Sequence, residues 1–194
     1  MTKLRLFDED GHRLFFNYEE RVAFLKAADK EAGMTRTFCC LLHYTGCNLP
    51  EATTLTAAQI DIPGRAILLK GTTVTRTVPV PDAFINLLTE VHNISAQSGD
   101  DDRNPLWTKH PQTMRDKLTR VIREAGIAGG PHATPMGIRY GFLVHAISRG
   151  VIVTRAERWM GYSHSSELGD YIEQLARSAP DVVRDEREDA ALMW

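Results

Sequence analysis

Cysteine is scarce in this 194-residue chain, and its placement argues against metal or disulfide chemistry. Only three cysteines are present, Cys39 and Cys40 are adjacent, and no C-x-x-C spacing occurs. Zinc sites and disulfide frameworks need such paired spacings. The histidines also lack the H-x-x-x-H spacing, with a partner carboxylate, of a metal site. The sequence therefore predicts no metal and no cofactor, and a reducing, cytoplasmic location.

Long apolar runs are also missing. No stretch approaches the ~20 residues that a membrane-spanning helix needs. Acidic residues at 8–10 stand where an export signal would carry its apolar segment. Internal repeats, low-complexity segments and glycine-rich nucleotide-binding patterns are absent as well. With 43% hydrophobic and 25% charged residues, the chain reads as one globular domain without a membrane partner.

The strong positive charge of many nucleic-acid-binding domains is absent, because the formal net charge is −2. The charge is uneven, however. Acidic residues concentrate at 8–10, 100–102 and 181–189, whereas basic residues outnumber acidic ones between Lys109 and Arg158. A basic middle is compatible with a local DNA-facing surface, although a charge run is more often a solvated face.

Hydrophobic periodicity predicts helices on both sides of a short β segment. Helical patterns cover residues 17–32, 35–45, 50–55, 82–91, 111–125, 134–149, 154–160 and a stretch from about 180 to the end. Between residues 58 and 81, runs rich in Ile, Val and Thr separated by turn residues predict three short antiparallel strands. We expect an α+β fold, mainly α with a small antiparallel three-stranded sheet. It divides into an arm or hairpin (1–16), a core domain (17–175) and a C-terminal helix (176–194).

The stretch from Thr134 to Tyr171 carries the features that point to chemistry. Thr134-Pro135 is a helix start, and Arg139 follows in the first turns. Gly161 breaks the chain into a polar loop, and Tyr171 lies just beyond it. A rigid helix that holds a cation, a tight loop and a positioned phenol suit the handling of a phosphate.

Five short motifs, in this order along the chain, resemble those of the tyrosine recombinase catalytic domain (the phage integrase family). The T-G-x-R-x-x-E motif fits residues 45–51, except that Asn48 replaces the arginine. The β-hairpin lysine corresponds to Lys70. The H-x-x-R box is present with Met136 in place of the histidine and with Arg139 retained.

The last two motifs complete the resemblance. The L-G-H-S-S box places Tyr162 at its His/Trp position, and Tyr171 follows at the family's usual distance to the nucleophile. The resemblance covers roughly residues 17–175 and implies the tyrosine recombinase catalytic-domain fold. The family's N-terminal clamping module has no counterpart in the sixteen or so residues before this core.

The resemblance implies a metal-independent phosphoryl transfer on double-stranded DNA. A tyrosine, here Tyr171, attacks a phosphodiester while two arginines stabilise the non-bridging oxygens and a lysine, here Lys70, protonates the leaving oxygen. Asn48 removes one of these arginines, and loss of a cationic clamp on a phosphoryl group costs about 10³–10⁵ in rate.

The resemblance also implies a set of candidate site residues. The catalytic candidates are Tyr171, Arg139, Lys70 and Tyr162, with degenerate positions at Asn48 and Met136 and with Arg76, His132 and His164 as substitutes for the missing groups. The DNA-binding candidates are Lys70, Arg76, Arg139, Arg115 and Lys117.

Each residue also has a plain structural interpretation. Asn48 suits a helix terminus, Met136 suits core packing, and Lys70 suits an exposed turn. Tyr171 suits a half-buried tyrosine, and Arg139 suits a salt-bridged surface position.

Three function classes remain open. The first is a DNA-binding regulator or accessory factor that has lost or impaired strand cleavage. The second is an active site-specific recombinase or integrase that cuts through Tyr171. The third is a protein-interaction module without DNA binding, with self-association through the C-terminal helix.

Overall fold

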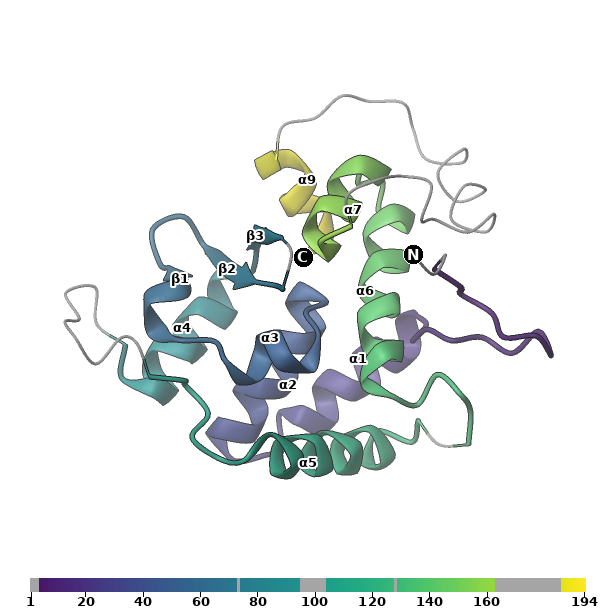
Figure 1. The fold of residues 1–194 in the computed structure, drawn as a ribbon, viewed down its shortest axis with the longest axis horizontal. Coiled ribbons are helices and arrows are strands. Elements are labelled where there is room, and N and C mark those ends of the chain that lie inside the picture. The colour runs from purple at the N-terminus through teal and green to yellow at the C-terminus, as the bar shows by residue number, and fades with distance from the viewer. Residues whose placement is uncertain (1–3, 73, 95–103, 128, 163–185) are drawn as a thin grey trace.

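The computed structural model describes residues 4–72, 74–94, 104–127, 129–162 and 186–194 (Figure 1). It is mainly helical with a small sheet at one side of the helices, as expected for an α+β fold. The elements are α1 (Tyr18–Ala28), α2 (Gly33–Thr45), α3 (Leu49–Thr53), the 3₁₀ turn η1 (Ala57–Gln59), β1 (Ile60–Asp61), β2 (Ala66–Lys70), β3 (Thr75–Pro79), α4 (Asp82–His92), α5 (Pro111–Glu124), α6 (Pro135–Ser148), α7 (Val153–Met160) and α9 (Glu186–Met193). None of the described helices is long and apolar enough to cross a membrane.

Helix α1 begins where the sequence predicts and ends sooner. Asn17 caps it through a reciprocal capping box with Glu20. The helix ends at Ala28 rather than near 32, and Gly33 is the first residue of α2 rather than the end of α1. Its buried apolar residues include Phe24 at 0% exposure.

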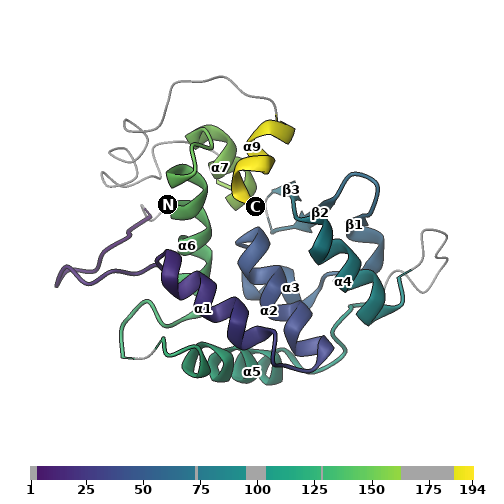
Figure 2. The same ribbon diagram turned by 180° about the vertical axis from the view of Figure 1, so that it is seen from behind.

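Helix α2 is the centre of the core. It packs against α1, α4, α5 and α6, and these surround it in both views (Figures 1 and 2). Phe38, Leu41 and Leu42 are buried in the core. The helix ends at Gly46, whose φ of 60° is in the left-handed region that favours glycine.

The three strands form an antiparallel sheet in the order β1-β2-β3, which confirms the predicted sheet. Leu69 of β2 lies opposite Arg76 of β3, and both side chains point to the buried face. Alternation along β3 buries Arg76 and Val78 and exposes Thr75 and Thr77. Arg76 therefore enters the interior from a strand.

Helix α6 starts at the predicted cap, where the side chain of Thr134 accepts the Gly137 amide at 3.1 Å. Apolar residues at helical spacing are buried along α6, including Phe142 and Leu143 at 0% exposure. Met136 is 49% exposed, so its assignment to core packing is wrong.

The two ends of the described chain lie against the same core. Residues 6–14 form a short hairpin with a bridge between Phe7 and Arg13. Helix α9 packs on α6 of its own chain, and Asp189 pairs with Arg155 of α7 at 2.8 Å. Docking of this helix on a neighbouring molecule stays a prediction.

Candidate functional site

Arg139 joins the ends of two helices. Its Nη1 donates to the Gly46 carbonyl at 2.5 Å, and its Nη2 donates to the Met160 carbonyl at 2.6 Å. These carbonyls lie at the C-terminal ends of α2 and α7, where the helix dipole is negative and favours a cation. The guanidinium also lies over the Tyr162 ring, 5.6 Å from its centroid. Arg139 is thus fixed in position by three elements.

The fixed guanidinium keeps hydrogen-bonding capacity. An arginine has five N–H donors, and the two carbonyl bonds use two of them. The side chain is only partly buried, so an incoming anion can reach it. Arg139 can therefore bind a phosphate oxygen with little rearrangement.

Asn48, which stands at the position of the missing arginine, serves as the cap of α3. Its side-chain Oδ1 accepts a hydrogen bond from the Glu51 backbone amide at 2.8 Å, and the Asn48 backbone amide donates to Glu51 Oε2 at 2.9 Å. This reciprocal capping box confirms the helix-terminus interpretation. The asparagine oxygen is therefore engaged by the backbone.

Glu51 and Arg76 form a buried ion pair behind that cap. Arg76 Nη1 lies 2.6 Å from Glu51 Oε1, and Nη2 lies 2.9 Å from Oε2. The Nε atom donates to the Trp159 carbonyl at 2.6 Å. The side chains are 3% and 5% exposed. The pair locks β3, α3 and α7 together next to Arg139.

This burial bears on the two roles predicted for Arg76. A substitute clamp and a DNA contact both require an accessible guanidinium, whereas that of Arg76 is enclosed and donates to both Glu51 carboxylate oxygens and a carbonyl. In this structure Arg76 supports the site from inside.

The charges of this cluster reinforce one another. Burial alone would raise the pKa of the Glu51 carboxyl, but hydrogen bonds from Arg76 and the Asn48 amide, with the charges of Arg76 and Arg139, hold the pKa below its ordinary value. Glu51 is therefore ionised at neutral pH. It cancels one of the two arginine charges, so the cluster offers one uncompensated cation, Arg139.

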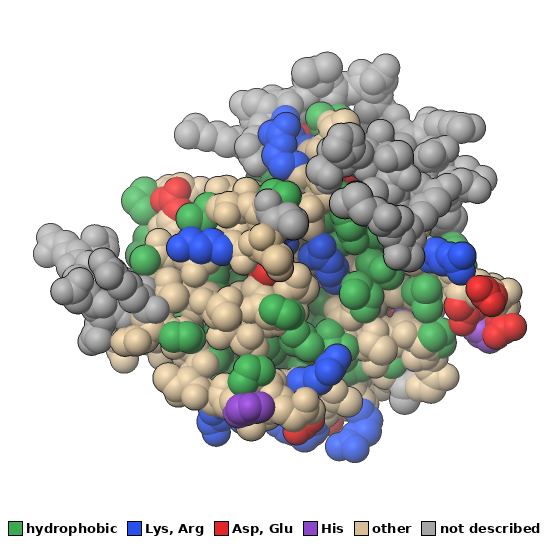
Figure 3. Space-filling view, in the orientation of Figure 1, with side chains coloured by type: hydrophobic (Ala, Val, Ile, Leu, Met, Phe, Trp, Pro, Cys, Tyr) green, Lys and Arg blue, Asp and Glu red, His purple; other side chains and the backbone are tan. Residues whose placement is uncertain are grey.

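The remaining cationic candidates lie on different elements. Lys70 is exposed at the end of β2, opposite Thr75. Arg115 is exposed on α5. Lys117 is half-buried and donates to Thr35 Oγ1 of α2 at 3.1 Å, so it faces the protein. Figure 3 shows Lys and Arg side chains scattered singly over one face rather than gathered in a continuous patch.

His132 is the histidine candidate that the structure describes, and its contacts are with α1 and the segment before it. His132 Nε2 lies 3.0 Å from Glu20 Oε1, which also accepts from Arg13, and its ring contacts Phe16. Its bonds therefore connect the loop before α6 to α1. His164 and Tyr171 lie outside the described residues.

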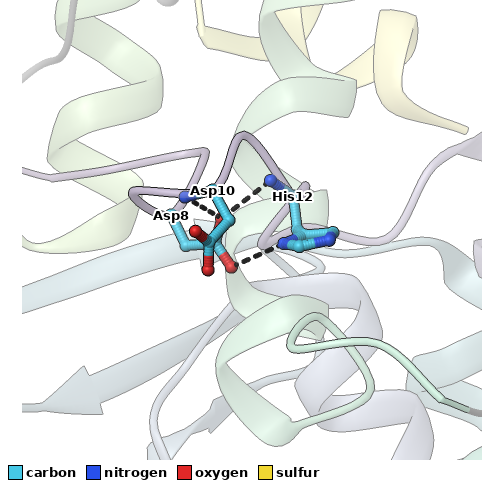
Figure 4. Close-up of side chains that lie close together, drawn as sticks. All are labelled: Asp8, Asp10 and His12. Atoms are coloured by element: carbon cyan, nitrogen blue, oxygen red, sulfur yellow. Dashed lines mark hydrogen bonds and ion pairs between the residues drawn. The ribbon is translucent and has the colours of Figure 1, made fainter.

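One group of acidic and histidine side chains is close enough to share a cation in the part of the chain that the structure describes (Figure 4). Asp8 Oδ1 accepts the amides of Asp10 and His12 at 3.0 and 2.7 Å, and Oδ2 lies 3.2 Å from the His12 ring. These bonds account for the turn of the hairpin without a metal.

The ion pair at the centre of the site is the feature that motif matching missed. The available signal was the period-2 alternation of β3, which places Arg76 on the same face as Val78. A buried arginine needs a carboxylate, and Glu51 is the acidic residue of the T-G motif.

Comparison with known proteins gives a consistent result. The model of the family described as "Phage integrase family" matches residues 15–177. "Tyrosine recombinase XerA" of Pyrococcus furiosus is 24% identical over 172 residues, which is 85% of this chain and 59% of that protein. Tyrosine recombinase XerA of Thermococcus onnurineus is 26% identical over 138 residues, 68% of this chain and 48% of that protein. The chain thus spans about half to three fifths of these relatives.

Solved structures share the fold. A crystal structure of XerA recombinase gives a TM-score of 0.68 at 17% identity, covering 88% of this chain and 67% of that one. The XerH site-specific recombinase bound to its difH substrate gives 0.66 at 18% identity, covering 95% and 59%. The catalytic domain of bacteriophage HP1 integrase gives 0.57 at 20% identity, covering 91% and 92%. At these identities the likeness establishes the fold.

Proposed function

This chain belongs to the phage integrase family, and from that premise we propose that it binds double-stranded DNA while strand cleavage is lost or strongly impaired. It would act as a regulator or accessory factor at the DNA rather than as an efficient recombinase. Support for DNA binding comes from the family and from a relative of the same fold, XerH, which was solved on its difH substrate.

The proposed loss of cleavage rests on Asn48, which stands where the family has an arginine. Asn48 caps α3 through Glu51, and the neighbouring arginine, Arg76, is buried on the same glutamate. Two arginines on the phosphoryl oxygens are what the family chemistry needs. Among the described arginines of this cluster Arg76 is enclosed and Arg139 is accessible, so one cation instead of two would face the negative charge of the transition state.

Two cationic residues would contact the DNA backbone. Arg139 would hold one backbone phosphate at the junction of α2, α6 and α7. Lys70, at the exposed end of β2, would contact the DNA backbone as a second cation. Phosphate contacts of this kind position DNA without reading its sequence.

The DNA-binding half of the proposal is tested by salt dependence. Binding of a 30-base-pair duplex of random sequence should weaken steeply between 50 and 200 mM salt, because each neutralised phosphate contributes a slope of about −0.9 in log K against log salt. Absence of binding at 50 mM salt would reject this half and favour a protein-interaction module.

The cleavage half needs a trap. Sequences selected for binding from a randomised pool would be rebuilt as nicked duplexes, on which a cleaving tyrosine forms a covalent adduct that cannot religate. We expect bound DNA without adduct. An adduct that disappears in Tyr171→Phe would instead establish the second function class, an active recombinase that cuts through Tyr171.

A further inference from the structure

Arg21 is a buried cation without a carboxylate partner among the described residues. It lies on α1 at 3% exposure. Among the described residues its side chain has one hydrogen-bond contact, which joins Arg21 Nη2 to His43 Nε2 of α2 at 3.2 Å. Arg21 Nη1 and His43 Nδ1 are buried without a hydrogen-bond partner in the part of the chain that the structure describes. Buried charges are normally paired, so this arrangement is incomplete.

Histidine does not supply the missing charge. Burial, with the charges of Arg21 and His145, keeps the pKa of His43 well below its ordinary value. His43 is therefore neutral and accepts the Arg21 hydrogen bond through Nε2. Burial lowers the pKa of Arg21 to about 9, so the guanidinium remains charged at neutral pH. No side chain among the described residues supplies the compensating negative charge.

Space for an anion lies next to Arg21. Two cavities of about 250 Å³ each share the lining residues Tyr18, Arg21, His145 and Arg149. Neither has an Asp or Glu among its described lining residues, whereas the shared lining carries two arginines. Residues of α1 and α6 line both cavities, and residues of α2 and the C-terminal end of α9 also line one of them.

We propose that these cavities form a binding site for a small oxyanion, a phosphate or carboxylate group, held by Arg21 from inside and by Arg149 at the rim. The site is separate from the one built around Arg139, and none of the residues of that cluster lines it. It therefore stands whether or not the chain cleaves DNA.

The oxyanion site is coupled to the docking of α9. Arg149 Nε donates to the Leu192 carbonyl at 2.7 Å, and His145 Nε2 lies 3.3 Å from the Met193 carbonyl. Met193 and Trp194 line one of the two cavities. An oxyanion on Arg21 and Arg149 would therefore hold α9 more firmly on α1 and α6.

Inorganic phosphate tests the proposal by thermal unfolding of the full chain at constant ionic strength, with sodium chloride as the balancing salt. A specific site raises Tm by about 3–6 °C at ten times the dissociation constant, and the rise continues with the logarithm of the phosphate concentration. Isothermal titration on the same samples gives the stoichiometry. Succinate in place of phosphate distinguishes a carboxylate site from a phosphate site.

Variants assign the response to this cavity. Arg21→Met should abolish it, Arg149→Gln should weaken it several-fold, and Lys26→Gln, which removes an exposed charge from the same helix, should leave it intact. Arg139→Gln should also retain it. A response lost in Arg139→Gln but kept in Arg21→Met would belong to the DNA site and overturn the proposal.

The stability of Arg21→Met without phosphate gives a second readout. A cation that awaits an anion is destabilising when the site is empty, so an apolar side chain of similar length should leave Tm unchanged or raise it. If Arg21 serves only as a structural partner of His43, the variant lowers Tm, and neither anion raises the Tm of the wild-type protein or gives saturable binding by titration. If Arg21→Met does not fold, the response of Arg149→Gln decides.

Discussion

Arg76 and Glu51 lie on different elements, 25 positions apart, and make a two-point ion pair in which both side chains are almost fully enclosed. Removing one partner of such a pair leaves the other charge buried and alone. We predict that Arg76→Met lowers the free energy of unfolding by about 3–5 kcal/mol at pH 7. Urea denaturation measures this loss.

A double-mutant cycle separates the pair from its surroundings. In Arg76→Met/Glu51→Gln neither charge is left alone, so the double variant should recover part of the loss, with a coupling energy of about 1–3 kcal/mol. Additive single losses would show that the pair is not a unit.

The same pair predicts a pH signature. Despite burial, hydrogen bonds from Arg76 and the Asn48 amide depress the pKa of Glu51, so its stabilising contribution is present above the unfolded pKa of about 4.3 and is lost as pH falls through the lower folded value. In Arg76→Met the buried carboxyl favours its neutral form. We therefore expect the stability gap between wild-type and Arg76→Met to shrink from pH 7 to pH 3.5.

Urea midpoints across this pH range test the signature, because the gap between the two proteins cancels the titration of other carboxyls. Glu51→Gln serves as the control, since its gap to Arg76→Met/Glu51→Gln should not change with pH. A gap between wild-type and Arg76→Met that stays constant would contradict the assignment to Glu51.

Gly46 is required for two reasons, and one matched variant separates them. A Cβ at this residue would lie 2.7 Å from Phe142 Cδ1, and φ is +60°. Gly126 has a similar φ of +75° but open space around the added atom. We predict a loss of about 2–4 kcal/mol for Gly46→Ala and about 1–2 kcal/mol for Gly126→Ala.

The consequence for function follows from the Gly46 carbonyl, which accepts Arg139. A shifted backbone at Gly46 would displace the guanidinium, so Gly46→Ala should also weaken DNA binding, whereas Gly126→Ala should not. Fluorescence anisotropy with the random 30-base-pair duplex measures both. Equal affinities would separate Gly46 from the site.

Arg139→Ala should weaken binding to all DNA sequences alike, because a phosphate contact carries no sequence information. Loss of one phosphate contact reduces the slope of log K against log salt by about one. Lys26→Ala, an exposed cation at the end of α1, should leave the slope unchanged. A change of sequence preference without a change of slope would argue for a base contact instead.

Most of the fold could be predicted because its signals are local. Asn17 and Thr134 cap their helices through their own side chains, and alternating residues such as Ile67 and Leu69 mark the strands. The prediction for Met136 failed for a different reason. It lies seven positions before the buried Leu143, on the same helical face, but it stands in the first turn of α6 and is exposed there.

The candidate site was harder to predict, since its geometry depends on contacts between distant segments. Motif spacing identifies Arg139 as a phosphate candidate, but gives no hint that carbonyls of Gly46 and Met160 fix its position. Motif spacing also offers Arg76 as a substitute clamp. Only the packing of β3 against α3 and α7 reveals that Glu51 and the Trp159 carbonyl already hold it.

Asn48 provides the sharpest prediction, because restoring the family residue should restore part of the chemistry. Asn48→Arg adds a cation beside Arg139 and removes the cap of α3, which costs about 1 kcal/mol of stability. Met136→His fills the exposed position of the missing histidine at little cost, since surface substitutions usually stay within about 0.5 kcal/mol. We predict that the double variant forms a covalent adduct with a nicked duplex on the order of 10²–10³ faster than the wild-type protein.

Two controls give this gain its meaning. Asn48→Asp keeps the cap but adds a negative charge, so it should fold as stably as the wild-type protein and bind DNA more weakly. Adding Tyr171→Phe to the Asn48→Arg/Met136→His variant should remove the adduct while leaving binding intact. If the double variant binds DNA more tightly yet forms no adduct, the missing arginine is not what limits cleavage, and the loss of activity has a second cause outside this cluster.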